Sequence, residues 1–171
     1  RHCPKCQGHK KVQWVEARTS ELLPVPYFHV VFTLPDELNT LALHQPKIVY
    51  DALFKSAWQT IEAFTGKNNK PGMLSILHTW GQNLSLHPHI HCIIPGGFVA
   101  PNDVWKLSKN QGKFLFPVKA MSRVYRAKYV ALLRASVLEL PHTIYDSLFK
   151  KEWVVYAKRP FGTPASVVEY L

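Results

Sequence analysis

The stretch that most constrains the fold is Leu86-His87-Pro88-His89-Ile90-His91-Cys92-Ile93-Ile94. Successive side chains of a β-strand point to opposite faces of its sheet. A strand here therefore places His87, His89 and His91 on one face and turns Ile90 toward the core. We expect the three imidazoles to share one surface of the protein.

The paired histidines His89 and His91 have the spacing of a metal site. Two histidines at positions i and i+2 of a strand can bind one metal ion, and a neutral imidazole is a ligand for Zn, Mn, Fe, Ni or Cu. The alternative is a chance run of surface or core histidines, which is less expected for three histidines than for a lone pair. The sequence therefore predicts a metal centre on this face.

The segments around the histidines alternate between strand and helix patterns. An aromatic and β-branched run at 27–34 predicts a strand, and apolar residues recur at helical spacing over 45–64. Residues 73–80 and 89–94 are predicted to form the two strands of a hairpin. For the rest of the chain we expect short strands and loops over 98–119, a helix over 120–140, a short helix near 144–149, a strand over 153–157 and the start of a helix over 165–171.

The composition favours a nucleic-acid partner. The chain holds 21 Lys and Arg against 11 Asp and Glu, so its formal net charge is +10 and its pI is near 9.6. Such a surface attracts polyanions, although a basic surface without such a partner is the alternative. Apolar stretches are interrupted within roughly ten residues, short of the ~20 that a membrane helix requires, so we expect no membrane span.

The cysteines and the first residues indicate how the chain is organised. Cys3 and Cys6 form a Cys-x-x-Cys pair and Cys92 lies in an apolar run, which is not a disulfide framework and favours a reducing cytoplasm. The chain starts without a methionine or a signal core, so we expect it to be cut from a longer one. Its length accommodates one domain and a small appendage, which we place at 21–171 and 1–20.

Several motifs follow one another in a characteristic order. His89-Ile90-His91, preceded by a proline, resembles the HUH signature of rolling-circle replication initiators, relaxases and related transposases. The flanking motifs lie at 1–7, 27–35, 77–82, 87–97, 155–162 and 169–171. A bare HUH triplet is a weak signal, but the ordered series resembles the two-tyrosine transposases of bacterial rolling-circle insertion sequences along the whole chain.

The resemblance implies a fold and an activity. The fold is an α/β, HUH endonuclease-like sandwich with a mainly antiparallel central sheet and helices on one face. The activity is that of a DNA transposase, a nuclease and strand transferase that nicks and rejoins single-stranded DNA at transposon ends through a metal-assisted 5′-phosphotyrosine intermediate. Residues 1–20 would end a zinc-binding segment and 21–171 would form the catalytic domain. We expect such a protein in the bacterial cytoplasm, associated with the nucleoid.

Tyr170 is the residue that the resemblance implies as nucleophile. It lies on the helix predicted to begin after Pro164, where the family's tyrosine motif would start. A phenol with a pKa near 10 is almost wholly protonated at neutral pH, so it requires activation by position and charge. The family's second tyrosine would lie four residues later, beyond Leu171.

A third metal ligand is expected beside His89 and His91. Gln82 lies seven residues before His89, where a hairpin brings its amide oxygen alongside, and related initiators hold Glu or Gln at the matching position. His87, on the same face, and His78, on the preceding strand, are the alternatives in that order. An oxygen ligand beside two imidazoles suits Mg²⁺ or Mn²⁺, with positions left for phosphate oxygens.

Two further pairs of residues carry binding predictions. Lys158 and Arg159 are expected to contact DNA phosphates, with a solvated role as the alternative. Candidates for stacking on unpaired bases are the aromatics Trp80, Trp105 and Phe161, with a core role as the alternative for each. Cys3 and Cys6 are predicted to be half of a four-ligand Zn²⁺ site. The competing functions are a non-catalytic nucleic-acid-binding module whose histidines hold structural zinc, and a metal-dependent hydrolase of small substrates.

Overall fold

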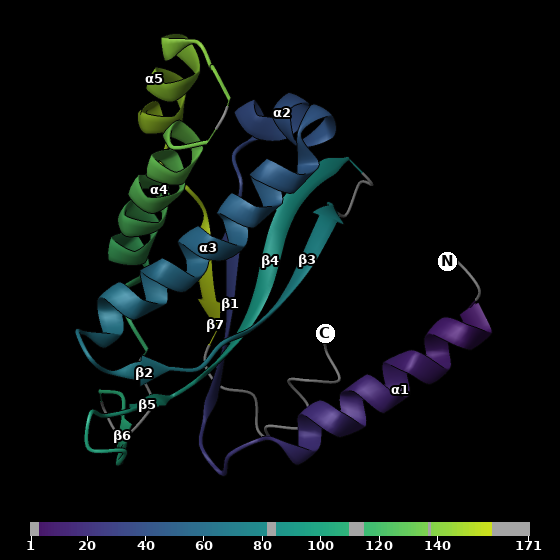
Figure 1. Ribbon diagram of the computed structural model, residues 1–171, viewed down its shortest axis with the longest axis vertical. Helices are drawn as coiled ribbons and strands as arrows, with labels where there is room; N and C mark the ends of the chain where they lie inside the picture. Colours follow the sequence, from purple (N-terminus) through teal and green to yellow (C-terminus); the bar gives the residue numbers. More distant parts are fainter. Residues whose placement is uncertain (1–3, 82–84, 110–114, 137, 159–171) are drawn as a thin grey trace.

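A four-stranded antiparallel sheet forms the centre of the molecule (Figure 1). The computed structural model describes residues 4–81, 85–109, 115–136 and 138–158. The strands of the sheet, in spatial order, are β3 (Leu74–Trp80), β4 (Leu86–Pro95), β1 (Tyr27–Thr33) and β7 (Val155–Lys158). Strands β3 and β4 pair as the predicted hairpin, and β1 pairs with both β4 and β7.

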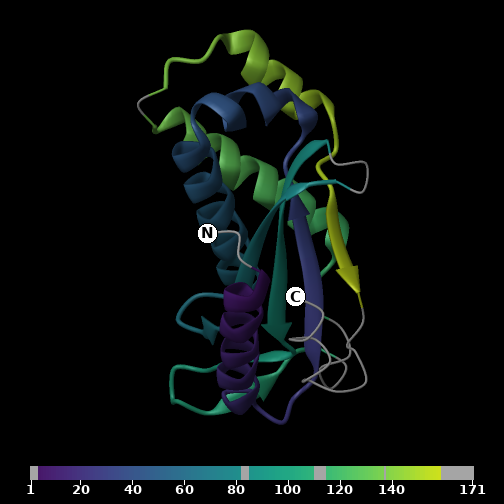
Figure 2. The ribbon, with the colours of Figure 1, turned by 90° about the vertical axis from the view of Figure 1, so that its right-hand side faces the viewer.

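Two long helices cover one face of this sheet (Figure 2). Helix α3 (Pro46–Thr65) starts on a proline, which has no backbone N–H to leave unpaired, and ends at Gly66, whose φ of 93° suits glycine. Helix α4 (Val118–Arg134) packs beside α3. Shorter helices follow β1 and α4, namely the 3₁₀ helix η1 (Asp36–Leu38), α2 (Asn39–His44) and α5 (His142–Lys150).

The core lies between the sheet and these helices. Alternate residues of the two central strands, such as Phe32 and Ile90, are fully buried against the helix layer. Tyr125 of α4 is also fully buried and packs edge-on against Trp153. The expected α/β sandwich, with an antiparallel sheet and helices on one face, is confirmed.

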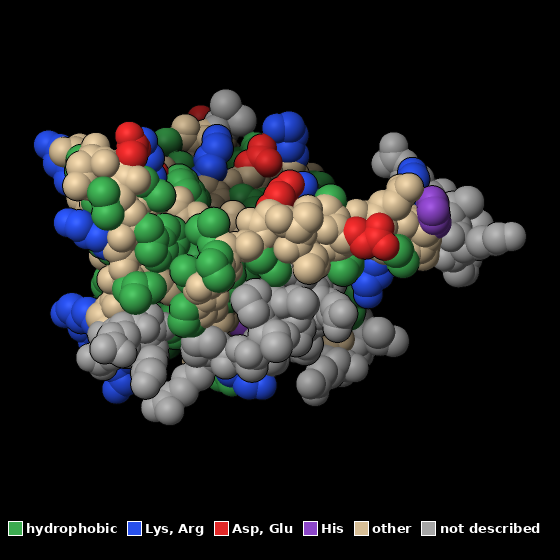
Figure 3. Space-filling view, turned by 90° about the horizontal axis from the view of Figure 1, so that it is seen from below, with side chains coloured by type: hydrophobic (Ala, Val, Ile, Leu, Met, Phe, Trp, Pro, Cys, Tyr) green, Lys and Arg blue, Asp and Glu red, His purple; other side chains and the backbone are tan. Residues whose placement is uncertain are grey.

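A small second sheet lies at one end of the molecule. It contains β2 (Lys70–Pro71), β5 (Gly97–Val99) and β6 (Trp105–Leu107). Gly97 is required there, because a Cβ at this position would collide with the backbone of Lys106 and the ring of Trp105. Figure 3 views the molecule from below and shows apolar side chains gathered on that surface.

One helix was not predicted, and one predicted helix ends early. No helix was predicted within residues 1–20, but Pro4–Ser20 form helix α1, which projects from the sheet and packs on it through Trp14 (Figure 1). The helix predicted over 120–140 ends at Arg134, because Ser136 donates both its N–H and its hydroxyl to the carbonyl of Leu133 and closes the last turn. The predicted helix over 165–171 lies outside the described residues. Among the described residues, no helix is both long and apolar enough to cross a membrane.

Candidate metal centre

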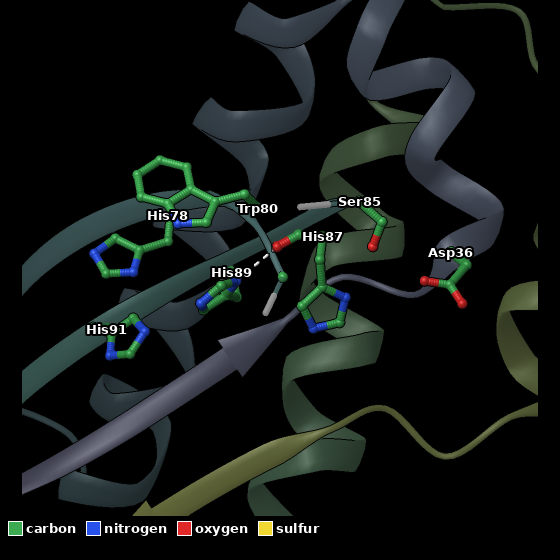
Figure 4. A pocket seen from close by; sticks show the side chains of 8 residues that line it. Asp36, His78, Trp80, Ser85, His87, His89 and His91 are labelled. Atoms are coloured by element: carbon green, nitrogen blue, oxygen red, sulfur yellow. Dashed lines mark hydrogen bonds between the residues drawn. The ribbon is translucent and has the colours of Figure 1, made fainter. Parts of the chain in front are cut away.

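Three histidines from two neighbouring strands converge on the face of the sheet opposite helices α3 and α4 (Figure 4). His89 and His91 come from β4, and His78 comes from β3, directly opposite His89 in the strand register. Each residue offers one ligand atom, and these atoms all lie within 4.8 Å of one another. The group is therefore close enough to hold one metal ion.

The alternation of β4 produces this arrangement. Ile90 and Cys92 point toward the helix layer and are fully buried, while His89 and His91 point to the other face and are half-buried. Residues that pair across an antiparallel ladder have Cβ atoms about 5 Å apart, which brings His78 beside the pair. The prediction that the strand separates histidines from core residues is confirmed.

Hydrogen bonds hold two of the imidazoles in place. The Nδ1 of His89 lies 2.6 Å from the backbone carbonyl of His87, which can only accept, so this nitrogen carries the proton and Nε2 keeps its lone pair. The Nδ1 of His91 lies 2.8 Å from Nε2 of His29, and the two rings stack with centroids 4.9 Å apart. Such partners orient metal-binding histidines in known metal sites.

Burial favours the neutral form of His29, His78 and His91. It lowers the pKa of His91 to about 4, assisted by the proximity of His78, His29 and His89. Burial also lowers the pKa of His78, with a smaller effect from His89, and that of His29, with smaller effects from Lys158 and His78. A metal ion requires the unprotonated imidazole, so the lowered pKa values of His78 and His91 favour the form that binds metal.

An open cavity of about 760 Å³ lies over the histidines. Its walls include Asp36 from η1, Ser85 just before β4, His87 from the start of β4, and Trp80 from the end of β3 (Figure 4). Three imidazoles leave a tetrahedral or octahedral metal ion with free positions, which is the pattern of catalytic sites, whereas structural zinc sites are closed by four protein ligands. The space suits a phosphate group beside the metal.

The structure positions some of the predicted site residues and not others. His87 lines the cavity but does not belong to the three-histidine group, whose third member is His78. Lys158 lies on β7, paired with His29. Outside the described residues lie Cys3, Gln82, Arg159, Tyr170 and the side chain of Cys6.

Sequence reasoning missed His29, which is 4% exposed and bonded to His91. The one signal in the sequence was its odd residue number. In the predicted strand 27–34, odd-numbered and even-numbered residues point to opposite faces, and this alternation could have placed His29 on a polar face. That signal becomes specific only when β1 is known to pair with β4, because this pairing sets His29 next to His91 in space.

The chain matches two family models. Residues 72–171 match the family described as "Putative transposase", and residues 1–34 match a "Transposase zinc-binding domain". The chain is 36% identical over 191 residues to Putative transposase y4qJ of Sinorhizobium fredii, covering 100% of this chain and 48% of the relative. It is 36% identical over 107 residues to the transposase for insertion sequence element IS801 of Pseudomonas savastanoi pv. phaseolicola, covering 62% of this chain and 26% of the relative.

The chain thus spans about half, or less, of the length of these curated relatives. Among solved structures it is similar to TrwC in complex with a 27-mer DNA that comprises the recognition hairpin and the cleavage site. The TM-score is 0.51 at 15% identity, over 66% of this chain and 46% of that chain. At this identity the likeness shows the fold alone, and it agrees with the HUH endonuclease-like architecture expected from the sequence.

Proposed function

Because this chain belongs to the transposase family whose model matches residues 72–171, we propose that it nicks and rejoins single-stranded DNA through a 5′-phosphotyrosine intermediate. The observation that carries the proposal is the convergence of His78, His89 and His91 under an open cavity. Strand cleavage requires a cation that neutralises the charge gathering on the scissile phosphate. A three-imidazole group with room for phosphate oxygens suits that task.

Tyr170 is the proposed nucleophile. Its phenol oxygen attacks the scissile phosphorus, the bond from phosphorus to the 3′ oxygen breaks, and the leaving oxygen takes up a proton to become a free 3′-hydroxyl. The new tyrosyl phosphodiester keeps the energy of the bond that was broken, so a 3′-hydroxyl can reverse the attack without ATP. A bound cation would stabilise the extra negative charge on the phosphate oxygens.

The metal at this site is proposed to be Mn²⁺ or Mg²⁺. His78 supplies a third nitrogen ligand, and Gln82, two residues after the end of β3, stays the proposed oxygen ligand. Nitrogen ligands favour Mn²⁺ over Mg²⁺, which prefers oxygen. We therefore expect Mn²⁺ to support cleavage at lower concentration than Mg²⁺, and Gln82→Ala to weaken the use of either ion more than it weakens folding.

Other parts of the chain are proposed to hold zinc and DNA. Cys3 and Cys6 would supply two of four zinc ligands, which agrees with the zinc-binding family that matches residues 1–34. Lys158, on the strand beside His29, and Arg159 would contact phosphates of single-stranded DNA at transposon ends. We propose that the protein works on the nucleoid in the bacterial cytoplasm.

The test is an incubation with single-stranded DNA carrying the ends of the element and Mn²⁺, followed by a denaturing gel for a covalent adduct. We expect one adduct, which Tyr170→Phe removes because the ring is kept and the attacking oxygen is lost. Tyr156→Phe is the matched control, because Tyr156 is an exposed tyrosine on β7. An adduct on Tyr156 or Tyr27 would contradict the choice of nucleophile. Tightly held zinc without any adduct would favour a non-catalytic binding module.

A further inference from the structure

Trp80 lies at the rim of the histidine cavity, and its indole ring stacks on the imidazole of His78. It ends strand β3, lines the cavity and is 55% exposed. Its ring is nearly parallel to that of His78, with centroids 5.3 Å apart and an angle of 7° between the planes. His78 therefore stacks against one face of the indole while more than half of the Trp80 residue stays exposed.

This exposure is unusual among the five tryptophans of the chain. Trp153 is buried and its Nε1 donates to the carbonyl of Leu148, while Trp14, Trp58 and Trp105 are partly buried. Leaving an indole in water forfeits the free energy that its burial would contribute. A rigid aromatic plane beside a phosphate-sized cavity therefore suits contact with a second flat ring.

We propose that Trp80 stacks on an unpaired nucleobase next to the phosphate bound at the histidine cluster. The inference rests on the proposed function, since it takes single-stranded DNA as the ligand of this cavity. Stacking on aromatic side chains is a common way to bind unpaired bases, and it tolerates any sequence because each base has a π face. Bases in a duplex are already stacked and paired, so a base subsite here selects for a single strand.

The position of Trp80 supports a base contact beside the metal rather than elsewhere. The ring of His78 lies next to the indole and also next to the rings of His89 and His91. A nucleotide that places its phosphate on the histidine group can therefore reach the indole with an adjacent base. His78 would then act in two ways, as a metal ligand on one side and as a support for the indole on the other.

The experiment compares base and backbone binding in two proteins. Oligothymidylate of about ten nucleotides and an abasic deoxyribose-phosphate chain of equal length are titrated with Mn²⁺ present, in a Tyr170→Phe background that blocks cleavage. The dissociation constant of the abasic chain divided by that of oligothymidylate measures what the bases add to binding. We expect Trp80→Leu to lower this ratio by about 5- to 100-fold and to leave abasic binding unchanged.

Two further variants make the result specific. Trp80→Phe keeps an aromatic plane and should retain most of the ratio. Phe149→Leu is the matched control, because Phe149 is an exposed aromatic on α5 that does not line the cavity. We expect no change for it.

The proposal is overturned if Trp80→Leu and its parent give the same ratio. It is also overturned if Trp80→Leu lowers only Mn²⁺ affinity, measured by calorimetry without DNA, because the indole would then serve to position His78. Failure of the proposed function is separate: it would appear as a missing Tyr170 adduct in the unmodified chain, whereas base stacking is read from binding without cleavage.

Discussion

The two faces of strand β4 differ in what they contribute. Ile90 and Cys92 face the helix layer and are fully buried, whereas His89 and His91 face a cavity and are half-buried. The apolar face gains the free energy of removing hydrocarbon from water. On the histidine face, burial disfavours the charged form of the His91 imidazole and so works against folding where that imidazole would be protonated.

This difference shows how one strand separates stability from chemistry. Alternation lets neighbouring residues serve opposite purposes without sharing contacts, because each pair of adjacent side chains points to different sides of the sheet. Substitutions on the two faces should therefore act on different measurements. A change on the histidine face should alter metal binding and cleavage, and a change on the apolar face should alter the free energy of unfolding.

The largest effect is expected for His91→Ala. Loss of one of three ligands should lower single-strand cleavage by about 10³-fold or more, because charge stabilisation by a metal is worth several kcal/mol. The free energy of unfolding and the affinity for non-specific DNA should change little. A gel assay for cleavage and a urea titration check both parts. His87→Ala is the control, because His87 lies on the same face but outside the three-histidine group. Cleavage by His91→Ala at the unmodified rate would refute the metal assignment.

Ile90→Ala tests the opposite face. It leaves a cavity between the sheet and the helices, and we expect it to lower the free energy of unfolding by about 2–5 kcal/mol. The change should appear as a lower midpoint in a urea titration. Leu43→Ala removes a side chain of equal size from an exposed position and should have an effect within about 0.5 kcal/mol. An Ile90→Ala protein as stable as its parent would show that this face does not carry the core.

Much of the fold followed from local patterns in the sequence. The alternation at 86–94 predicted which residues enter the core, and the runs at 27–34 and 45–64 predicted β1 and α3 within one or two residues. These elements are long and strongly patterned, so each segment specifies its own structure. Helix α1 was not predicted because its polar sequence has no apolar stripe, and its packing depends on contacts of Trp14 with the sheet.

The composition of the site was harder to predict, because it depends on which strands pair and in what register. His78 ranked below Gln82 and His87 as a ligand, yet it joins His89 and His91 because β3 and β4 pair it directly with His89. A shift of one residue in that register would turn His78 to the other face. His29 joins the site through the pairing of β1 with β4, between residues 62 positions apart in sequence.

His29→Phe sharpens the comparison within the histidine face. The substitution keeps a flat ring but removes the nitrogen that forms a hydrogen bond with His91. The His91 ring should then stay in the site but lose the contact that fixes its orientation. We expect Mn²⁺ affinity, measured by calorimetry, to fall by about 10- to 100-fold, as for other partners of metal-binding histidines. Tyr27→Phe removes a polar group from the same strand, one that accepts from the N–H of Leu23, and should leave Mn²⁺ affinity unchanged. Equal affinity in the two variants would remove His29 from the metal site.

The smallest effect concerns the pH dependence of the metal-free protein. His91 has a pKa of about 4 in the folded chain and an ordinary value of 6.5, so between these values the unfolded chain takes up a proton that the folded chain does not. The free energy of unfolding should therefore fall as the pH is lowered from 6.5 toward 4. We expect His91 to account for a loss on the order of 1 kcal/mol, because solvent reaches the half-buried ring and screens its interactions. His91→Asn, which cannot take up this proton, should lose less stability over the same window.

The measurement is a set of urea titrations with chelator across that pH range. If the two proteins lose stability in parallel, burial does not hold His91 in its neutral form, and the two faces of β4 differ less in electrostatics than their burial implies.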